Sequence, residues 1–300
     1  MDRYAESTKA IIPIIYAPVI SPRVAQILKE RDIGFVDAAG NCWIRSLENH
    51  LLIERTGFRS PRGRTEPSID PFKPKSSRIV RAMLSQPEKG WQVRELADDA
   101  NVRVSLGLVV KVKRTLIEEG FAVERDKRVY LRDPGGLLKA WSEKYAGPAD
   151  EIPLYFRGEA AVAEEAAGRW CKARGLQYAL AGFSAAWRLA PEVRYSVGSV
   201  YVADAGFDPK LLTELGEKYG GKRVDSGPNL YLWRPFDLSV FADSDGARRA
   251  EAPVTSALQS YLDLNRTPGR GEDAANAIFE KHLSRAFQAV EKREQERQRA

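Results

Sequence analysis

The chain has 300 residues, of which 43% are apolar, and a formal net charge of +6. This length fits two or three domains, and the composition supplies enough apolar residues for their cores. The two cysteines, Cys42 and Cys171, and the two histidines, His50 and His282, lack partners at the spacing of a disulfide framework, a zinc site or a catalytic triad.

These features predict a protein without metal or cofactor. The apolar run 11–20 is short and contains Pro13 and Pro18, so we expect neither a signal peptide nor a membrane span. The use of cysteine fits a reducing compartment, and we predict a cytoplasmic protein with no membrane partner.

Helix and strand patterns are mixed along the whole chain, so we predict an α/β (α+β) fold with three domains. Residues 1–72 form a small α/β domain with a Pro-rich linker, residues 73–135 a winged helix-turn-helix, and residues 136–300 an α/β domain with a helical end.

The first domain is predicted to hold strands near residues 11–15, 34–37, 42–45 and 51–54 and a helix from Pro22 to Arg31, capped by Ser21. Asp37 at a strand end is typical of restriction-endonuclease-like folds, which also need a second carboxylate and a lysine near the metal. The following strand offers only Trp43-Ile44-Arg45. We therefore predict a scaffold or a decayed form of that fold, and keep a metal-dependent nuclease as an alternative.

The linker contains Pro61-Arg62-Gly63-Arg64, which resembles an AT-hook core. In such a core arginine side chains enter a narrow minor groove. Arg62 and Arg64 are therefore candidate minor-groove contacts, and a solvated linker is the alternative.

The excess positive charge lies in residues 73–132, with 14 Lys and Arg against 8 Asp and Glu. The preceding residues have 10 against 9 and the following ones 23 against 24. A basic excess confined to one small module is the electrostatic footprint of a nucleic-acid binder.

The same segment shows the element order of a winged helix-turn-helix. Helices are predicted from Ser76-Ser77 to Pro87, over Trp91–Ala97, and over Val104–Glu119 with Gly120 closing the last one. Strands at 121–124 and 129–131 enclose a basic hairpin tip at 125–128.

On the third helix Val109, Val112 and Leu116 share one side, whereas Gly107, Val110, Lys111 and Arg114 share the other. The second side would enter the major groove of double-stranded DNA, with Lys and Arg donating to guanine or phosphate. The candidate DNA-binding residues are Arg103, Ser105, Gly107, Lys111, Lys113, Arg114, Arg125, Lys127 and Arg128. A solvated charged face or a winged helix used only for protein contacts is the alternative.

In the last domain, helices are predicted at 136–146, 159–172, 185–189, 209–219, 255–264 and 272–291, and strands at 177–180, 195–203 and 230–233. Gly182-Phe183-Ser184 lies at a strand-to-helix turn, where nucleotidyltransferases place a Gly-Ser motif. Their two-metal chemistry needs two or three carboxylates, and the next strand offers Asp204 alone. We predict a nucleotidyltransferase-like domain without catalytic carboxylates, and no enzymatic activity.

Three motifs of this domain carry a resemblance: residues 181–186 (AGFSAA), residues 253–264 (PVTSALQSYLDL) and residues 269–275 (GRGEDAA). With the winged helix before them, they resemble the AbiEi-type antitoxins of type IV toxin–antitoxin systems and their stand-alone regulator relatives, over roughly residues 73–290. The α/β segment before the winged helix departs from simple antitoxins, so a stand-alone regulator is an alternative. Asp263 and residues 269–272 are interpreted either as helix-capping and turn residues or as a contact site.

The resemblance implies an antitoxin that represses its own promoter by binding inverted repeats, and a nucleotidyltransferase-like toxin as partner. A module that neutralises a toxin through residues 150–290 is the alternative function. One winged helix covers a short half-site, so we also expect a homodimer.

Overall fold

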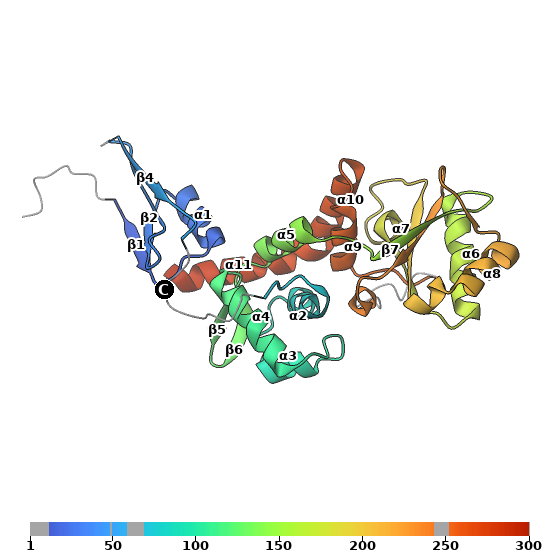
Figure 1. The fold of residues 1–300 in the computed structure, drawn as a ribbon, viewed down its shortest axis with the longest axis horizontal. Coiled ribbons are helices and arrows are strands. Elements are labelled where there is room, and N and C mark those ends of the chain that lie inside the picture. The colour runs from blue at the N-terminus through green and yellow to red at the C-terminus, as the bar shows by residue number, and fades with distance from the viewer. Residues whose placement is uncertain (1–11, 49, 59–68, 243–251, 300) are drawn as a thin grey trace, which may run out of the picture.

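The structure is a computed structural model that describes residues 12–299, except residue 49 and residues 59–68 and 243–251 (Figure 1). An N-terminal sheet with one helix, a central helical unit and a C-terminal sheet covered by helices follow one another along the molecule. The last helix runs back from the C-terminal unit along the central one (Figure 1). No helix in the described ranges is both long and apolar enough to cross a membrane.

The N-terminal unit is a four-stranded sheet with one helix. Its elements are β1 (Ile14–Ala17), α1 (Pro22–Glu30), β2 (Gly34–Asp37), β3 (Cys42–Ser46) and β4 (Leu51–Arg55). The strands lie in chain order; β1 and β2 are parallel because α1 connects them, and the other pairs are antiparallel. α1 packs Leu28 on Phe35 and Trp43, which form the core of this unit.

The central unit contains three helices and a β-hairpin. Its elements are α2 (Pro74–Ser85), α3 (Val93–Asp98), α4 (Leu106–Glu118), β5 (Ala122–Arg125) and β6 (Arg128–Leu131). The predicted start of the second helix at Trp91 is wrong, because Trp91 pairs with Val129 of the hairpin and Gln92 caps α3 in a capping box with Glu95.

A C-terminal unit follows. Its elements are α5 (Pro134–Lys144), β7 (Asp150–Tyr155), α6 (Ala160–Ala173), β8 (Tyr178–Ala181), α7 (Gly182–Leu189), β9 (Gly198–Val202), η1 (Asp204–Phe207), α8 (Pro209–Tyr219), β10 (Lys222–Arg223), β11 (Leu230–Arg234) and η2 (Leu238–Phe241). The five-stranded sheet has the order β10-β7-β11-β9-β8, in which only β11 and β9 are parallel. β7 and β10 were not predicted; β7 starts with two acidic residues and contains Pro153, which hid its strand pattern.

The chain ends in three helices: α9 (Ala257–Leu264), α10 (Arg270–Ile278) and α11 (Ser284–Arg299). The single helix predicted at 272–291 is wrong, because a π-helical turn, η4 (Phe279–Leu283), separates α10 from α11. α10 packs on α7 and α9, whereas α11 packs on α5. The wider turn lets the two helices contact different neighbours.

The largest hydrophobic cluster joins the central unit to helices that follow it in sequence. Besides α2, α3, α4 and the hairpin, the cluster contains side chains of α5, α9 and α11: Leu137, Leu138, Trp141, Leu258, Leu262, Phe287 and Val290. The predicted domain boundary between residues 135 and 136 falls inside α5, so the core of the central unit continues beyond it.

Candidate functional site

α4 separates a buried side from an exposed one, as its pattern predicts. Val109, Val112 and Leu116 are at most 1% exposed. Gly107, Val110 and Lys111 lie on the exposed side, and Arg114 beside them is half-buried and faces Glu118 at 3.8 Å. α4 therefore presents a mixed basic and apolar surface to the outside.

The turn before α4 has a strained backbone. Arg103 has φ of +45°, in the left-handed region that residues with a side chain rarely adopt. Two residues earlier, Asn101 donates its backbone N–H to Asp99 Oδ1 at 2.9 Å. Ser105 caps α4 by accepting the N–H of Leu108 at 3.3 Å. A shallow pocket of about 520 Å³ lies against Arg103 and Ser105.

The hairpin tip is a two-residue turn in which Asp126 and Lys127 both have positive φ, 48° and 62°. Such mirror-image turns match the twist of the strands. The residues on either side of it, Arg125 and Arg128, form a pair across the turn. Lys127 is exposed and has no polar partner in the described part of the chain.

Two of the predicted wing contacts bind the protein itself. Arg125 donates to both carboxylate oxygens of Glu294 on α11, at 2.7 Å for the Nη1–Oε1 contact. This hydrogen-bonded pair raises the pKa of Arg125 and lowers that of Glu294. Arg128 donates to the Gly90 carbonyl at 2.8 Å and faces Glu95 at 3.5 Å.

Lys113, a further candidate, makes an ion pair with Glu124 at 3.0 Å. This contact ties α4 to β5. The minor-groove candidates Arg62 and Arg64 lie outside the described residues.

A buried polar network lies where the central and C-terminal units meet. Asp263 Oδ1 accepts hydrogen bonds from the hydroxyls of Tyr145 and Tyr201 and from the amide of Gln259, each at 2.8 Å. Arg81 of α2 donates to Gln259 Oε1 at 2.5 Å. The sequence pointed to Asp263 through its motif only; its partners lie 62 or more residues away, except Gln259.

The pKa of Asp263 is raised further than that of any other described carboxyl group. Burial raises the pKa of Asp263 to about 6, against the opposing effects of its three hydrogen bonds and of the Arg81 charge. Burial, together with the charge of Asp263, also raises the pKa of both tyrosines. An ionised Asp263 is therefore costly, and the carboxyl group is half-ionised near pH 6 instead of near its usual pKa of 3.8.

A second contact joins the same two units. Arg78 of α2 binds Asp237 with two nitrogens, at 2.7–3.0 Å. Burial raises the pKa of Asp237, but the hydrogen bonds from Arg78 and Ser239 outweigh it and the net shift is downward. α2 is thus anchored to the C-terminal unit at two points.

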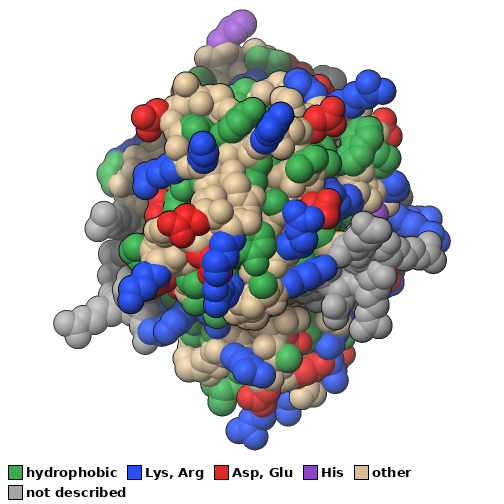
Figure 2. Space-filling view, turned by 90° about the vertical axis from the view of Figure 1, so that its right-hand side faces the viewer, with side chains coloured by type: hydrophobic (Ala, Val, Ile, Leu, Met, Phe, Trp, Pro, Cys, Tyr) green, Lys and Arg blue, Asp and Glu red, His purple; other side chains and the backbone are tan. Residues whose placement is uncertain are grey.

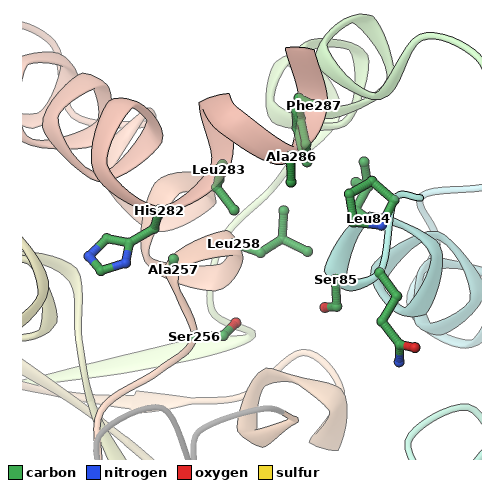
Figure 3. Close-up of a pocket in the computed structure, with 11 residues that line it drawn as sticks. Leu84, Ser85, Ser256, Ala257, Leu258, His282, Leu283, Ala286 and Phe287 are labelled. Atoms are coloured by element: carbon green, nitrogen blue, oxygen red, sulfur yellow. The ribbon is translucent and has the colours of Figure 1, made fainter. Parts of the chain in front are cut away.

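A small apolar cavity of about 240 Å³ lies between α2, α9 and α11. Figure 3 shows Leu258, Leu283, Ala286 and Phe287 around it, with Leu84 on the opposite wall. His282 extends to one side, where its Nε2 lies 2.9 Å from the carbonyl of Leu189.

Asp37 and Ser184, which the sequence suggested as candidates for catalysis, make structural hydrogen bonds. Asp37 Oδ1 accepts the N–H groups of Ala39 and Asn41 at 2.9 Å, and its Oδ2 accepts the Asn41 amide at 2.8 Å. Ser184 is fully buried and its Oγ accepts the N–H of Ser199 at 2.9 Å. In the described part of the chain, no three His, Cys, Asp or Glu side chains gather as metal ligands would.

Charged side chains form no patch of one sign on the far end of the C-terminal unit (Figure 2). Figure 2 shows Lys and Arg scattered there among acidic and apolar side chains. In the same unit, Arg174 and Lys218 share the carboxylate of Glu214. The surface agrees with the nearly balanced charge of residues 133–300.

Comparison with known proteins identifies a family. A family model described as a transcriptional regulator, the AbiEi antitoxin of a type IV toxin–antitoxin system, matches residues 130–284. No curated protein and no solved structure matches the chain. The matched part begins in β6 and covers the C-terminal sheet, the Asp263 network apart from Arg81, and the helices through η4. The chain therefore belongs to the AbiEi family of antitoxins and transcriptional regulators of type IV toxin–antitoxin systems.

Proposed function

We propose that the chain is a sequence-specific DNA-binding regulator of the antitoxin type, and that its central unit is a winged helix-turn-helix. The observation that carries the proposal is the outward side of α4, where Gly107, Val110 and Lys111 are exposed beside the hairpin. In this proposal α4 enters the major groove and the hairpin contacts the DNA backbone.

The contacts of the individual side chains refine their proposed roles. Lys111 and Arg114 read bases or bind phosphates from α4, and Lys127 binds phosphate from the hairpin tip. Arg103 and Ser105 bind phosphate at the start of α4. Because Arg125 and Arg128 are bound to Glu294, Glu95 and a carbonyl group, their proposed role is to hold the hairpin in place.

The proposed target is the promoter of the chain's own gene, bound as inverted repeats by a homodimer. The C-terminal unit, which contains most of the family match, is the proposed surface for a nucleotidyltransferase-like toxin. A nuclease is not favoured, because the oxygens of Asp37 are bound to the turn that follows β2.

Fluorescence anisotropy with the DNA upstream of the gene, compared with scrambled DNA over a salt series, tests the proposal. We expect the upstream DNA to bind about 10³-fold more tightly at physiological salt. The double variant Lys111→Ala/Arg114→Ala should lose about 10- to 100-fold in affinity for the upstream DNA.

Arg169→Ala on α6 is the matched control, since it also removes an exposed positive charge and should leave binding unchanged. Equal binding of the double variant and the wild type would show that α4 is not the reading helix.

A further inference from the structure

The N-terminal unit exposes more apolar surface than its size explains. Nine of the fifteen exposed large apolar side chains in the described chain lie between residues 14 and 58. Soluble proteins seldom leave large apolar patches uncovered, and such patches mark interaction sites. By register, four of the nine (Ile14, Tyr16, Leu51 and Ile53) lie on one face of the sheet and two (Ile15 and Leu52) on the other.

One face of the sheet is covered by α1. Phe35 and Trp43 are paired in register on this face and pack against the helix. The charged side chains of β3 and β4 on this face pair with α1 and the turn after it: Glu54 with Lys29 at 2.5 Å and Arg45 with Asp32 at 2.9 Å. Leu52 of β4 lies on the same face, because it is paired with Arg45.

The other face, here called the open face, carries the apolar side chains of Ile14, Tyr16, Val36, Cys42, Ile44, Leu51 and Ile53, together with Gly34, the buried Ser46 and Arg55. Register places Tyr16 beside Val36, and Ile44 beside Ile53. Tyr16 is 70% exposed and Ile53 39%, and no described helix lies on this face. The only charged side chain of the four strands on it is Arg55, which stacks on Phe58 at 4.8 Å.

We propose that the open face binds the open face of a second copy of this chain. A nearly uncharged apolar surface can meet itself about a two-fold axis, because no rows of like charges oppose each other. Sheets packed in this way lie about 10 Å apart. The toxin is the less suitable occupant, since the family match begins at residue 130 and excludes this unit.

The N-terminal unit is fixed to the central unit, so pairing of the sheets also pairs the central units. The Arg23 guanidinium of α1 binds Asp133 and lies 4.0 Å from the centre of the Phe121 ring. A two-fold axis between open faces therefore places two copies of α4 in a symmetric arrangement, as inverted repeats require. This step rests on the proposed function, whereas the pairing itself does not.

The size of the open face predicts a weak dimer. Four strands of about five residues cover roughly 300 Å² of sheet plane per copy, at about 4.8 Å between strands and 3.3 Å per residue. Stable complexes bury about 800 Å² per partner. We therefore expect dissociation in the micromolar range, and stronger pairing when both copies are on one DNA molecule.

Sedimentation velocity of the full chain from about 1 to 100 μM tests the pairing without DNA. We expect the wild type to pass from monomer to dimer, and both Ile53→Glu and Tyr16→Glu to stay monomeric. Leu52→Glu is the matched control: Leu52 is 61% exposed on the same strand and points to the opposite face, so this variant should still dimerise. Unchanged circular dichroism and thermal midpoints confirm that the variants fold.

A monomeric wild type at 100 μM would overturn the proposal, as would a dimer that both open-face variants leave intact. Anisotropy then separates the two proposals. The monomeric variants should bind a single half-site like the wild type but lose at least 10-fold on a duplex with two half-sites. If the wild type dimerises through the open face and binds neither duplex, the DNA-binding proposal fails and the dimer stands.

Discussion

Asp263 shows how one carboxyl group can make stability depend on pH. Its pKa is near 3.8 when unfolded and about 6 in the fold, so the folded state binds more protons between these values. The contribution of this group to the free energy of unfolding is therefore fully present below pH 4 and is lost as pH rises through 6. The difference corresponds to about 3 kcal/mol.

The variant Asp263→Asn should remove this dependence. An asparagine can keep all three hydrogen bonds at Oδ1, and its amide nitrogen replaces Oδ2, which has no hydrogen-bond partner among the described residues. We expect the variant to be more stable than the wild type at pH 8, by up to about 3 kcal/mol, and to lose that advantage near pH 4. Urea unfolding at several pH values measures this, and parallel profiles of the two proteins would contradict it.

At the scale of single elements, α4 shows what periodicity can predict. Val112 is completely buried and Val110 is 47% exposed, although they are two residues apart on one helix. The spacing of apolar residues in the sequence gave this division correctly, because a helix places residues three and four apart on one side.

Replacing valine by alanine at positions 112 and 110 should therefore change the free energy of unfolding by different amounts. Val112→Ala should lower the free energy of unfolding by about 2 kcal/mol through lost burial and a cavity. Val110→Ala should change it by less than about 0.5 kcal/mol. Chemical denaturation of both variants checks this, and similar losses would mean that the packing of α4 is misassigned.

Elements defined by distant contacts were not predictable in this way. Trp91 looked helical in the sequence but pairs with Val129, and the π-helical turn η4 leaves the apolar spacing of residues 272–291 almost unchanged. The same holds for the candidate site. The sequence pattern identified the basic residues of the hairpin, but it could not identify Glu294 on α11 as the partner of Arg125, because the two residues are 169 positions apart. Local patterns contain no information on such pairs.

At the scale of the whole molecule, the central unit is not independent of the rest. Its core includes α5, α9 and α11, and α2 is anchored to the C-terminal unit through Arg78 and Asp237. Removing these helices would expose the buried side chains that pack against them, which costs about 25 cal/mol for each Å² of apolar surface.

A chain that ends at residue 135 should therefore lack a cooperative unfolding transition. A chain that starts at residue 69 keeps every member of that core and should retain it. Urea titrations followed by tryptophan fluorescence compare the two. A sharp transition in the first fragment would show that the helices and hairpin fold without the later ones.

The return of α11 to the hairpin also has a consequence for synthesis on the ribosome. Phe287 and Val290 complete the core of the central unit, and Glu294 binds Arg125 although it follows it by 169 residues in the chain. A nascent chain exposes its basic residues long before their supporting helix has left the exit tunnel. The central unit thus reaches its final structure only after α11 has been translated, and copies terminated before Phe287 would lack part of its core.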